Sequence, residues 1–154
     1  MTPRKTQAVD CAADRIAGEC LAGRVRMLNR TITAIYDDAL RPLGLTSGQL
    51  NILVFIARRG PVAPGEVARR LNMEKSTVSR NVERMRKNGW LIVTAADPGR
   101  GQSLILARQG KVLLKKSLPA WDGAQARARE VLGRQGAESI RRVGDAVIRR
   151  MGAA

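Results

Sequence analysis

The stretch from Pro64 to Leu106 restricts the possible folds of this chain more than any other part of it. Its residues predict a short helix, a tight turn, a second helix, and then two short strands around a glycine-rich tip. In the second helix Val78, Val82 and Met85 recur at the helical period, so they share one apolar face. The opposite face carries the side chains of Ser76, Arg80, Arg84 and Lys87, with Thr77 on its flank.

The first helix and the turn make this pair a helix-turn-helix. Pro64 suits a first helical position and Glu66 suits the first turn. Only Met73 and Glu74 separate the two helices, which makes the second one the recognition helix. Hydroxyl and arginine side chains on its exposed face match base edges and phosphates. Taken alone, the same helix is equally consistent with a solvated basic face.

The two strands are predicted at residues 90–94 and 103–106. Between them, Asp97-Pro98-Gly99 has the composition of a turn, and Arg100 lies at the tip. A slim hairpin with one arginine at its tip fits the narrow minor groove, where the negative potential is enhanced. The alternative interpretation is an ordinary solvent-exposed turn.

The charge distribution supports a polyanionic partner. The formal net charge is +15, and residues 58–116, with 14 basic and 4 acidic side chains, supply +10 of it. Four aromatic residues in the whole chain are too few for recognition by base stacking, which disfavours single-strand and RNA-loop binding. Membrane surfaces are also anionic, but no basic helix carries large apolar anchors on its other face.

The sequence lacks the residue patterns that are typical of enzymes and metalloproteins. With no histidine and no CxxC pair we expect no metal and no cofactor. Asp37 and Asp38 are adjacent on a predicted helix and face apart, so no acid–base pair is evident. Without an apolar run of membrane-spanning length or an apolar signal core, we expect a cytoplasmic protein with no membrane partner. Two cysteines fit a reducing compartment.

The N-terminal part predicts one long helix and one buried helix. After a frayed arm at residues 1–10, the helical period runs from Asp14 to Leu43 and ends near Gly44. Thr46 and Gln49 form a capping box, which opens an apolar helix that stops at Gly60.

The C-terminal part is also helical. Pro119 should kink or split a helix that starts at Arg108 and reaches Gly133, and a last helix follows from about Ala137 to Met151. We expect the terminal helices to lack a partner within the winged unit and to pack with each other and with a second subunit. The predicted fold is mainly α with a small β-wing. It divides into a helical dimerisation region, 14–45 and 108–151, and a winged helix-turn-helix DNA-binding domain, 46–107.

From Asp14 to Met151 the chain resembles the MarR family of winged-helix transcriptional regulators. The resemblance rests on YDDALRPLGLT (36–46), GEVARRLNMEKSTVSR (65–80), RMRKNGWL (84–91) and a wing that begins Asp97-Pro98. It implies a homodimer formed through the N- and C-terminal helices, with recognition helices in successive major grooves of a pseudo-palindrome and wings in the flanking minor grooves. Many such regulators are repressors released by a small phenolic or lipophilic effector.

The resemblance also assigns DNA-binding residues. The matching recognition-helix positions are Ser76, Thr77, Ser79, Arg80 and Arg84, and Arg100 matches the wing arginine. The family wing commonly reads Asp-Pro-x-Asp-Arg-Arg, whereas here Gly99-Arg100-Gly101 follows the proline and the second aspartate is missing. From their charge alone, we expect mainly phosphate contacts from Lys75, Arg58, Arg59, Arg86 and Lys87.

The sequence therefore predicts a transcriptional regulator, a repressor, that binds double-stranded DNA. One alternative is a winged-helix module whose basic part binds an acidic protein or RNA. Another is a redox-sensing regulator, because some relatives sense oxidants through a cysteine in the first helix, where Cys20 lies. Cys11 is nine residues away on the same predicted helix and is not placed to bridge it, and a small apolar role for Cys20 is the simpler interpretation.

Overall fold

The computed structural model describes residues 4–95 and 101–152, and within them the side chains of 9–95 and 101–150. The chain divides into two compact units, residues 1–34 and residues 35–154. The first contains α1 (Arg4–Glu19) and the start of α2 (Leu21–Leu40). In the described residues, no helix combines the length and apolarity needed to span a membrane.

The prediction for the N-terminal segment is wrong in two respects. Helix begins at Arg4, within the segment expected to be frayed, and the single long helix is interrupted at Cys20. Gly18 and Gly23 flank the interruption and weaken the helix on both sides of it. The guanidinium group of Arg24 donates hydrogen bonds to the carbonyl groups of Ala17, Gly18 and Cys20, which satisfies acceptors that the end of α1 leaves open.

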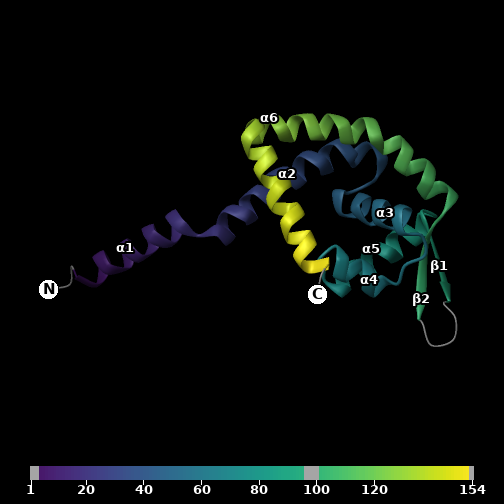
Figure 1. The fold of residues 1–154 in the computed structure, drawn as a ribbon, viewed down its shortest axis with the longest axis horizontal. Helices are drawn as coiled ribbons and strands as arrows, with labels where there is room; N and C mark the ends of the chain where they lie inside the picture. The colour runs from purple at the N-terminus through teal and green to yellow at the C-terminus, as the bar shows by residue number, and fades with distance from the viewer. Residues whose placement is uncertain (1–3, 96–100, 153–154) are drawn as a thin grey trace. The chain divides into compact units, whose positions relative to one another are not determined.

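The second unit holds the winged helix-turn-helix (Figure 1). Its elements, after the last residues of α2, are η1 (Arg41–Leu43), α3 (Ser47–Arg59), α4 (Pro64–Arg70), α5 (Lys75–Lys87), β1 (Leu91–Ala95), β2 (Gln102–Leu106) and α6 (Arg108–Gly152). A mainly α fold with a small β-wing is thus confirmed.

The start of α3 is fixed by side-chain caps, as the sequence predicts. Thr46 Oγ1 accepts the Gln49 backbone N–H at 3.3 Å, and Gln49 Oε1 accepts the Thr46 N–H at 3.1 Å. Asp37 Oδ1 accepts the Ser47 N–H at 2.7 Å, whereas Asp38 pairs with Arg41. The two adjacent carboxylates therefore serve different partners and form no acid–base pair.

The hydrophobic core lies around α3. Its central residues Ile52, Leu53 and Ile56 are fully or almost fully buried. The core residues supplied by the other elements are Leu40, Leu45, Val62, Val67, Ala68, Val78, Val82, Met85, Leu91, Leu104 and Leu106. The recognition helix and the wing are thus anchored on the same core, so their relative placement within this unit is fixed by packing.

The wing is an antiparallel hairpin extended by a third strand segment. Leu91 pairs with Leu106 and Ala95 with Gln102, so the strands start and end within one residue of the prediction. Val62 forms an isolated bridge with Leu104, with N–H···O distances of 2.8 and 3.2 Å. Sequence patterns did not indicate this segment, because Val62 lies between Pro61 and Ala63 and these residues do not alternate between apolar and polar side chains.

In α6 the break lies at Gly133 and not at Pro119. The helix continues through Pro119, whereas Gly133 has φ 67° and ψ 165°, a backbone conformation that side-chain-bearing residues avoid. The prediction that this part has no partner in the winged unit is wrong for its beginning, since Leu113, Leu114 and Ala120 pack against the core. Beyond Gly133, Val143 and Ile148 are more than half exposed.

Candidate nucleic-acid interface

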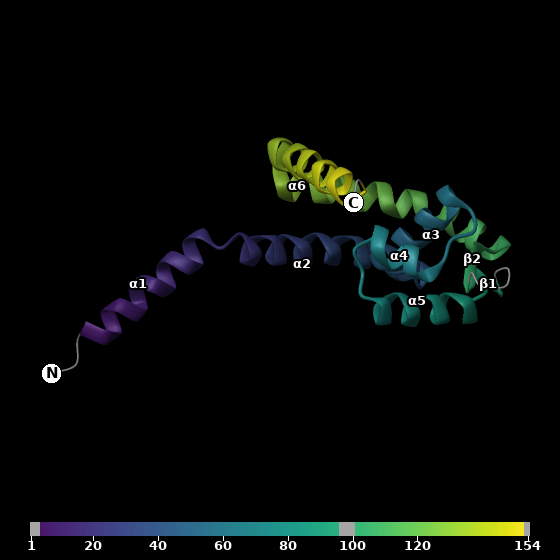
Figure 2. The same ribbon diagram turned by 60° about the horizontal axis from the view of Figure 1, so that its bottom comes forward.

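The helix-turn-helix is built by local backbone geometry. Pro64 opens α4, and Asn72 follows its C-cap in the left-handed region at φ 49°, which asparagine tolerates. The N–H of Met73 donates to the carbonyl of Ala68 at 2.9 Å and closes the turn. α5 then starts at Lys75. Figure 2 shows α5 along one edge of the unit, with α3 and α4 on one side of it only.

The two faces of α5 are as the periodicity predicts. Val78, Val82 and Met85 are buried, and Met85 is completely inaccessible to solvent. The predicted DNA-contacting residues on the other side, Lys75, Ser76, Ser79, Arg80 and Arg84, are all exposed, and Thr77 is half-buried. The helix therefore packs on the core through one side and presents cations and hydroxyls to solvent on the other.

Thr77 accepts two side-chain hydrogen bonds in the first turns of α5. Its backbone carbonyl accepts the Asn81 side-chain amide at 3.0 Å, and its hydroxyl accepts a hydrogen bond from Arg80 Nη2 at 3.4 Å. The guanidinium group of Arg80 is thus held beside a hydroxyl on the exposed face of the helix. Because Arg80 is exposed, a base or a phosphate can replace this hydroxyl as its partner.

Glu83 carries the ion pairs formed by α5 among the described residues. Its carboxylate accepts hydrogen bonds from Arg86 Nε and Nη2, both at 3.0 Å, and lies 3.5 Å from Lys87 Nζ. The hydrogen bonds from Arg86 hold the pKa of Glu83 below its usual value, and Glu83 raises the pKa of Arg86. A carboxyl group with a lowered pKa keeps its ion pair at neutral pH and loses it only as the pH falls through that lowered pKa.

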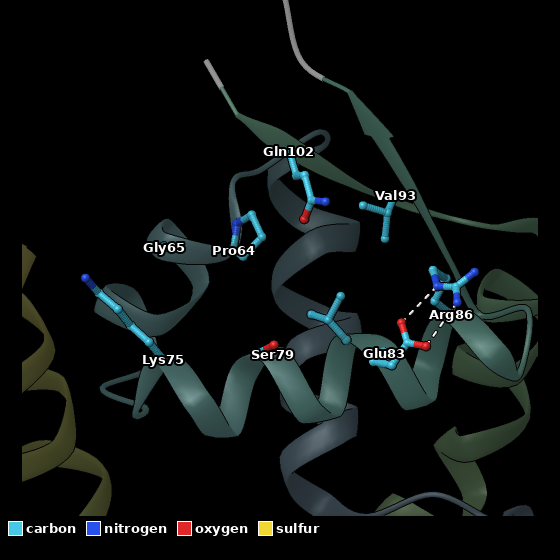
Figure 3. Close-up of a pocket in the computed structure, with 9 residues that line it drawn as sticks. Pro64, Gly65, Lys75, Ser79, Glu83, Arg86, Val93 and Gln102 are labelled. Atoms are coloured by element: carbon cyan, nitrogen blue, oxygen red, sulfur yellow. Dashed lines mark hydrogen bonds and ion pairs between the residues drawn. The ribbon is translucent and has the colours of Figure 1, made fainter. Parts of the chain in front are cut away.

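A groove runs between the recognition helix and the wing (Figure 3). From α5 it is lined by Lys75, Ser79, Val82, Glu83 and Arg86, and from the other elements by Pro64, Gly65, Val93 and Gln102. The close-up shows the side chains of Val93 and Gln102 on the wing strands facing Ser79 and Glu83 across it. Glu83 is the only acid among these lining residues.

The basic side chains of the cationic segment, residues 58–116, are accessible to solvent at the positions named here. Arg58 and Arg59 at the end of α3 are exposed, as are Arg86 and Lys87 at the end of α5. Arg100, the predicted wing contact, lies outside the described residues. The described part of the cationic segment is therefore available to a polyanion.

Neither cysteine forms part of this interface. Cys11 is exposed on α1, and Cys20 is half-buried at the break before α2, where its Sγ accepts the Gly23 N–H at 3.4 Å. Both thiols are free. In the described part of the chain, no group of three or more acidic, histidine or cysteine side chains is placed to hold a metal ion.

Two polar residues of the groove, Glu83 and Gln102, were absent from the predicted site. The spacing of Glu83 to Arg86 and Lys87, three and four residues along a helix, is the pattern of intrahelical ion pairs and was readable in the sequence. Gln102 carries no such signal, because only the hairpin register brings it over α5.

The fold and this interface define a winged helix-turn-helix transcription regulator, and comparisons with known proteins agree. A family model described as MarR family matches residues 43–102. The M. tuberculosis transcriptional regulator MosR in complex with DNA is similar, with 32% identity and a TM-score of 0.73 over 88% of this chain and 98% of that one. We conclude that the chain belongs to the MarR family of transcriptional regulators.

Two further proteins are consistent with this. The HTH-type regulator YwoH of Bacillus subtilis is 28% identical over 91 residues, which is 59% of this chain and 66% of YwoH, just under two thirds of its length. A MarR mutant from E. coli complexed with operator DNA has a TM-score of 0.75 at 17% identity, over 86% of this chain and 96% of that one. At that identity the likeness concerns the fold alone. MosR and YwoH are both described as transcriptional regulators and neither as an enzyme.

Proposed function

We propose that the chain is a cytoplasmic repressor that binds pseudo-palindromic double-stranded DNA as a homodimer. The observation that carries this proposal is the recognition helix, which buries Val78, Val82 and Met85 and exposes its basic and hydroxyl side chains beside the wing. The MosR complex, whose protein is 32% identical, contains DNA and supports the same partner here. The proposed contacts are Lys75, Ser76, Thr77, Ser79, Arg80, Arg84 and Arg100.

The proposed dimerisation region is 14–45 together with 108–151. In the N-terminal unit the large apolar side chains of Ile16, Leu21 and Met27 are 66%, 76% and 70% exposed in the single chain. In α6 the side chains of Val143 and Ile148 are similarly exposed. Apolar surface of this extent in helices favours burial against a second copy. As in many members of the family, we propose that a small lipophilic or phenolic effector controls DNA release.

Selection of bound duplexes from random DNA at near-physiological salt tests this proposal. We expect a dyad-symmetric site whose half-sites lie about one helical turn, roughly 34 Å, apart. Sedimentation of the free protein should give two chains per particle. A single-chain particle, or equal affinity for duplex DNA and structured RNA, would instead support a protein- or RNA-binding module.

The salt dependence of binding gives a second expected result. A dimer that neutralises on the order of ten phosphates should show a log–log slope of affinity against salt near −9. The slope is measured by fluorescence anisotropy with a labelled duplex at several salt concentrations. A slope close to zero would contradict an interface built on exposed cations.

Arg80→Ala should weaken binding to the selected site by about 1–3 kcal/mol and relax the preference at one base position, because the Thr77 hydroxyl holds the guanidinium group on the exposed face. Arg127→Ala removes the same charge from an exposed position of α6, and it serves as the control once sedimentation shows that the variant still forms a particle of two chains. If Arg80→Ala weakens binding equally on every sequence, Arg80 contacts a phosphate and not a base.

A further inference from the structure

The groove between α5 and the wing contains an acid where a polyanion is proposed to bind. Glu83 lies among Ser79, Val82 and Arg86 on the helix side, opposite Val93 and Gln102 on the strands (Figure 3). Its carboxylate uses both oxygens on Arg86, through Nε and Nη2 at 3.0 Å each. The Glu83 and Arg86 side chains are 49% and 50% exposed, so an incoming group can reach the pair.

The path of the DNA backbone follows from the proposed function, on which this inference rests. If α5 occupies the major groove and the wing the adjacent minor groove, the sugar–phosphate strand that separates the two grooves passes between α5 and the hairpin. That passage is the groove described above. A phosphate there would take the paired donors of an arginine, since a guanidinium group binds phosphate and carboxylate with the same two-pronged geometry.

We infer that Glu83 is an intramolecular competitor for phosphate, which occupies Arg86 and partly neutralises Lys87 in the free protein. A phosphate that enters the groove must displace the carboxylate from Arg86 or leave Arg86 uninvolved. In either case fewer cations of α5 are available to the DNA backbone, and sequence-independent affinity is lower than the positive charge of the helix would give. Arg80 and Arg84 take no part in the Glu83 ion pairs, so Glu83 does not compete with the DNA for them.

The competitor persists under the conditions in which a regulator works. A glutamate is ionised at neutral pH at its ordinary pKa, and Arg86, which lowers the pKa of Glu83, keeps the carboxylate ionised to a still lower pH. Glu83→Gln removes the charge while keeping the size of the side chain, so it isolates the electrostatic role. Thermal melting followed by circular dichroism checks that the variant keeps the fold, and its melting temperature should be close to that of the unaltered protein.

Glu83→Gln should bind a random-sequence duplex about tenfold more tightly at 0.1 M salt. One additional phosphate per subunit should steepen the log–log salt slope by about 0.9, or about 1.8 for a dimer. The affinity advantage over the unaltered protein should then shrink about 3.5-fold for each doubling of the salt concentration. A carboxylate with a purely structural role would not change this slope.

Glu138 provides the matched control, because it forms the same type of pair with Arg141, at 2.7 and 3.4 Å, on α6 outside the groove. Because Glu138 lies in the proposed dimerisation region, sedimentation must first show that Glu138→Gln still forms a particle of two chains. That dimer should have nearly unchanged affinity and slope. The increase in duplex affinity caused by Glu83→Gln should also be smaller in a protein that already carries Arg86→Gln.

Three results would overturn the inference: an unchanged or weaker affinity in Glu83→Gln, an equal gain in Glu138→Gln, or a full gain without Arg86. Failure of the unaltered protein to bind any duplex would instead refute the proposed function. The two failures are therefore distinguishable in one set of titrations.

Discussion

Replacing Leu104 with alanine should lower the free energy of unfolding by about 3–5 kcal/mol. Leu104 is completely buried in β2, pairs with Val93 of β1, and forms the bridge to Val62. Its side chain therefore fills the point where the three strand segments meet the core, and truncation leaves a cavity that the surrounding backbone cannot close. For a chain of this size the melting temperature should fall by about 10 °C.

Ile92→Ala is the control for Leu104→Ala. Ile92 is in the same hairpin but on its other face, and its side chain is 49% exposed. We expect it to cost less than about 1 kcal/mol, because little apolar area is returned to water. Urea unfolding of both variants makes the comparison. Equal losses would show that the wing stabilises the unit through its outer face as much as through the core.

Gly110→Ala should destabilise the fold by about 3 kcal/mol or more. A Cβ atom at this position would lie 2.2 Å from the carbonyl oxygen of Trp90 and 2.9 Å from Leu106 Cδ1. The Trp90 carbonyl cannot simply move away, because it also accepts the Ala107 N–H at 3.0 Å. The substitution must therefore separate the start of α6 from the segment that connects α5 to β1.

Gly123 gives a matched substitution with the opposite sign. It lies in the same helix, α6, and a Cβ atom added there would meet no described atom within 4 Å. Gly123→Ala should stabilise the protein by about 0.5–1 kcal/mol, since alanine loses less backbone entropy in a helix. Thermal unfolding of the two variants tests the pair. Similar changes in the unfolding free energy of both variants would mean that the close approach of Gly110 to Trp90 does not exclude a side chain at position 110.

The junction around Gly110 matters for function as well as for stability. It fixes the end of the recognition helix, the first strand of the wing and the beginning of α6 within a few residues of one another. A change at this point is expected to disturb the spacing of α5 and the wing, and hence DNA affinity, without altering any proposed DNA contact.

The parts of the fold that the sequence predicted well are those with local causes. The Thr46–Gln49 capping box, the tight turn between α4 and α5 and the buried stripe of Val78, Val82 and Met85 depend on residues a few positions apart. Such interactions do not depend on how distant segments pack. The helix-turn-helix, the hairpin and the break at Gly133 followed from local signals of this kind. Local signals failed at Cys20, where side-chain hydrogen bonds from Arg24 accompany an interruption that apolar periodicity does not show.

By itself the sequence determined the helix-turn-helix and the hairpin, which face of α5 is apolar, and where the positive charge is concentrated. Only the tertiary structure decided that Val62 joins the wing, that Gly110 must lie against Trp90, and that Gln102 faces Glu83 across a groove. The reason is physical: helix periods, caps and turns act over a few residues. Strand bridges and close backbone approaches depend instead on how the whole core packs, and no short pattern encodes that packing.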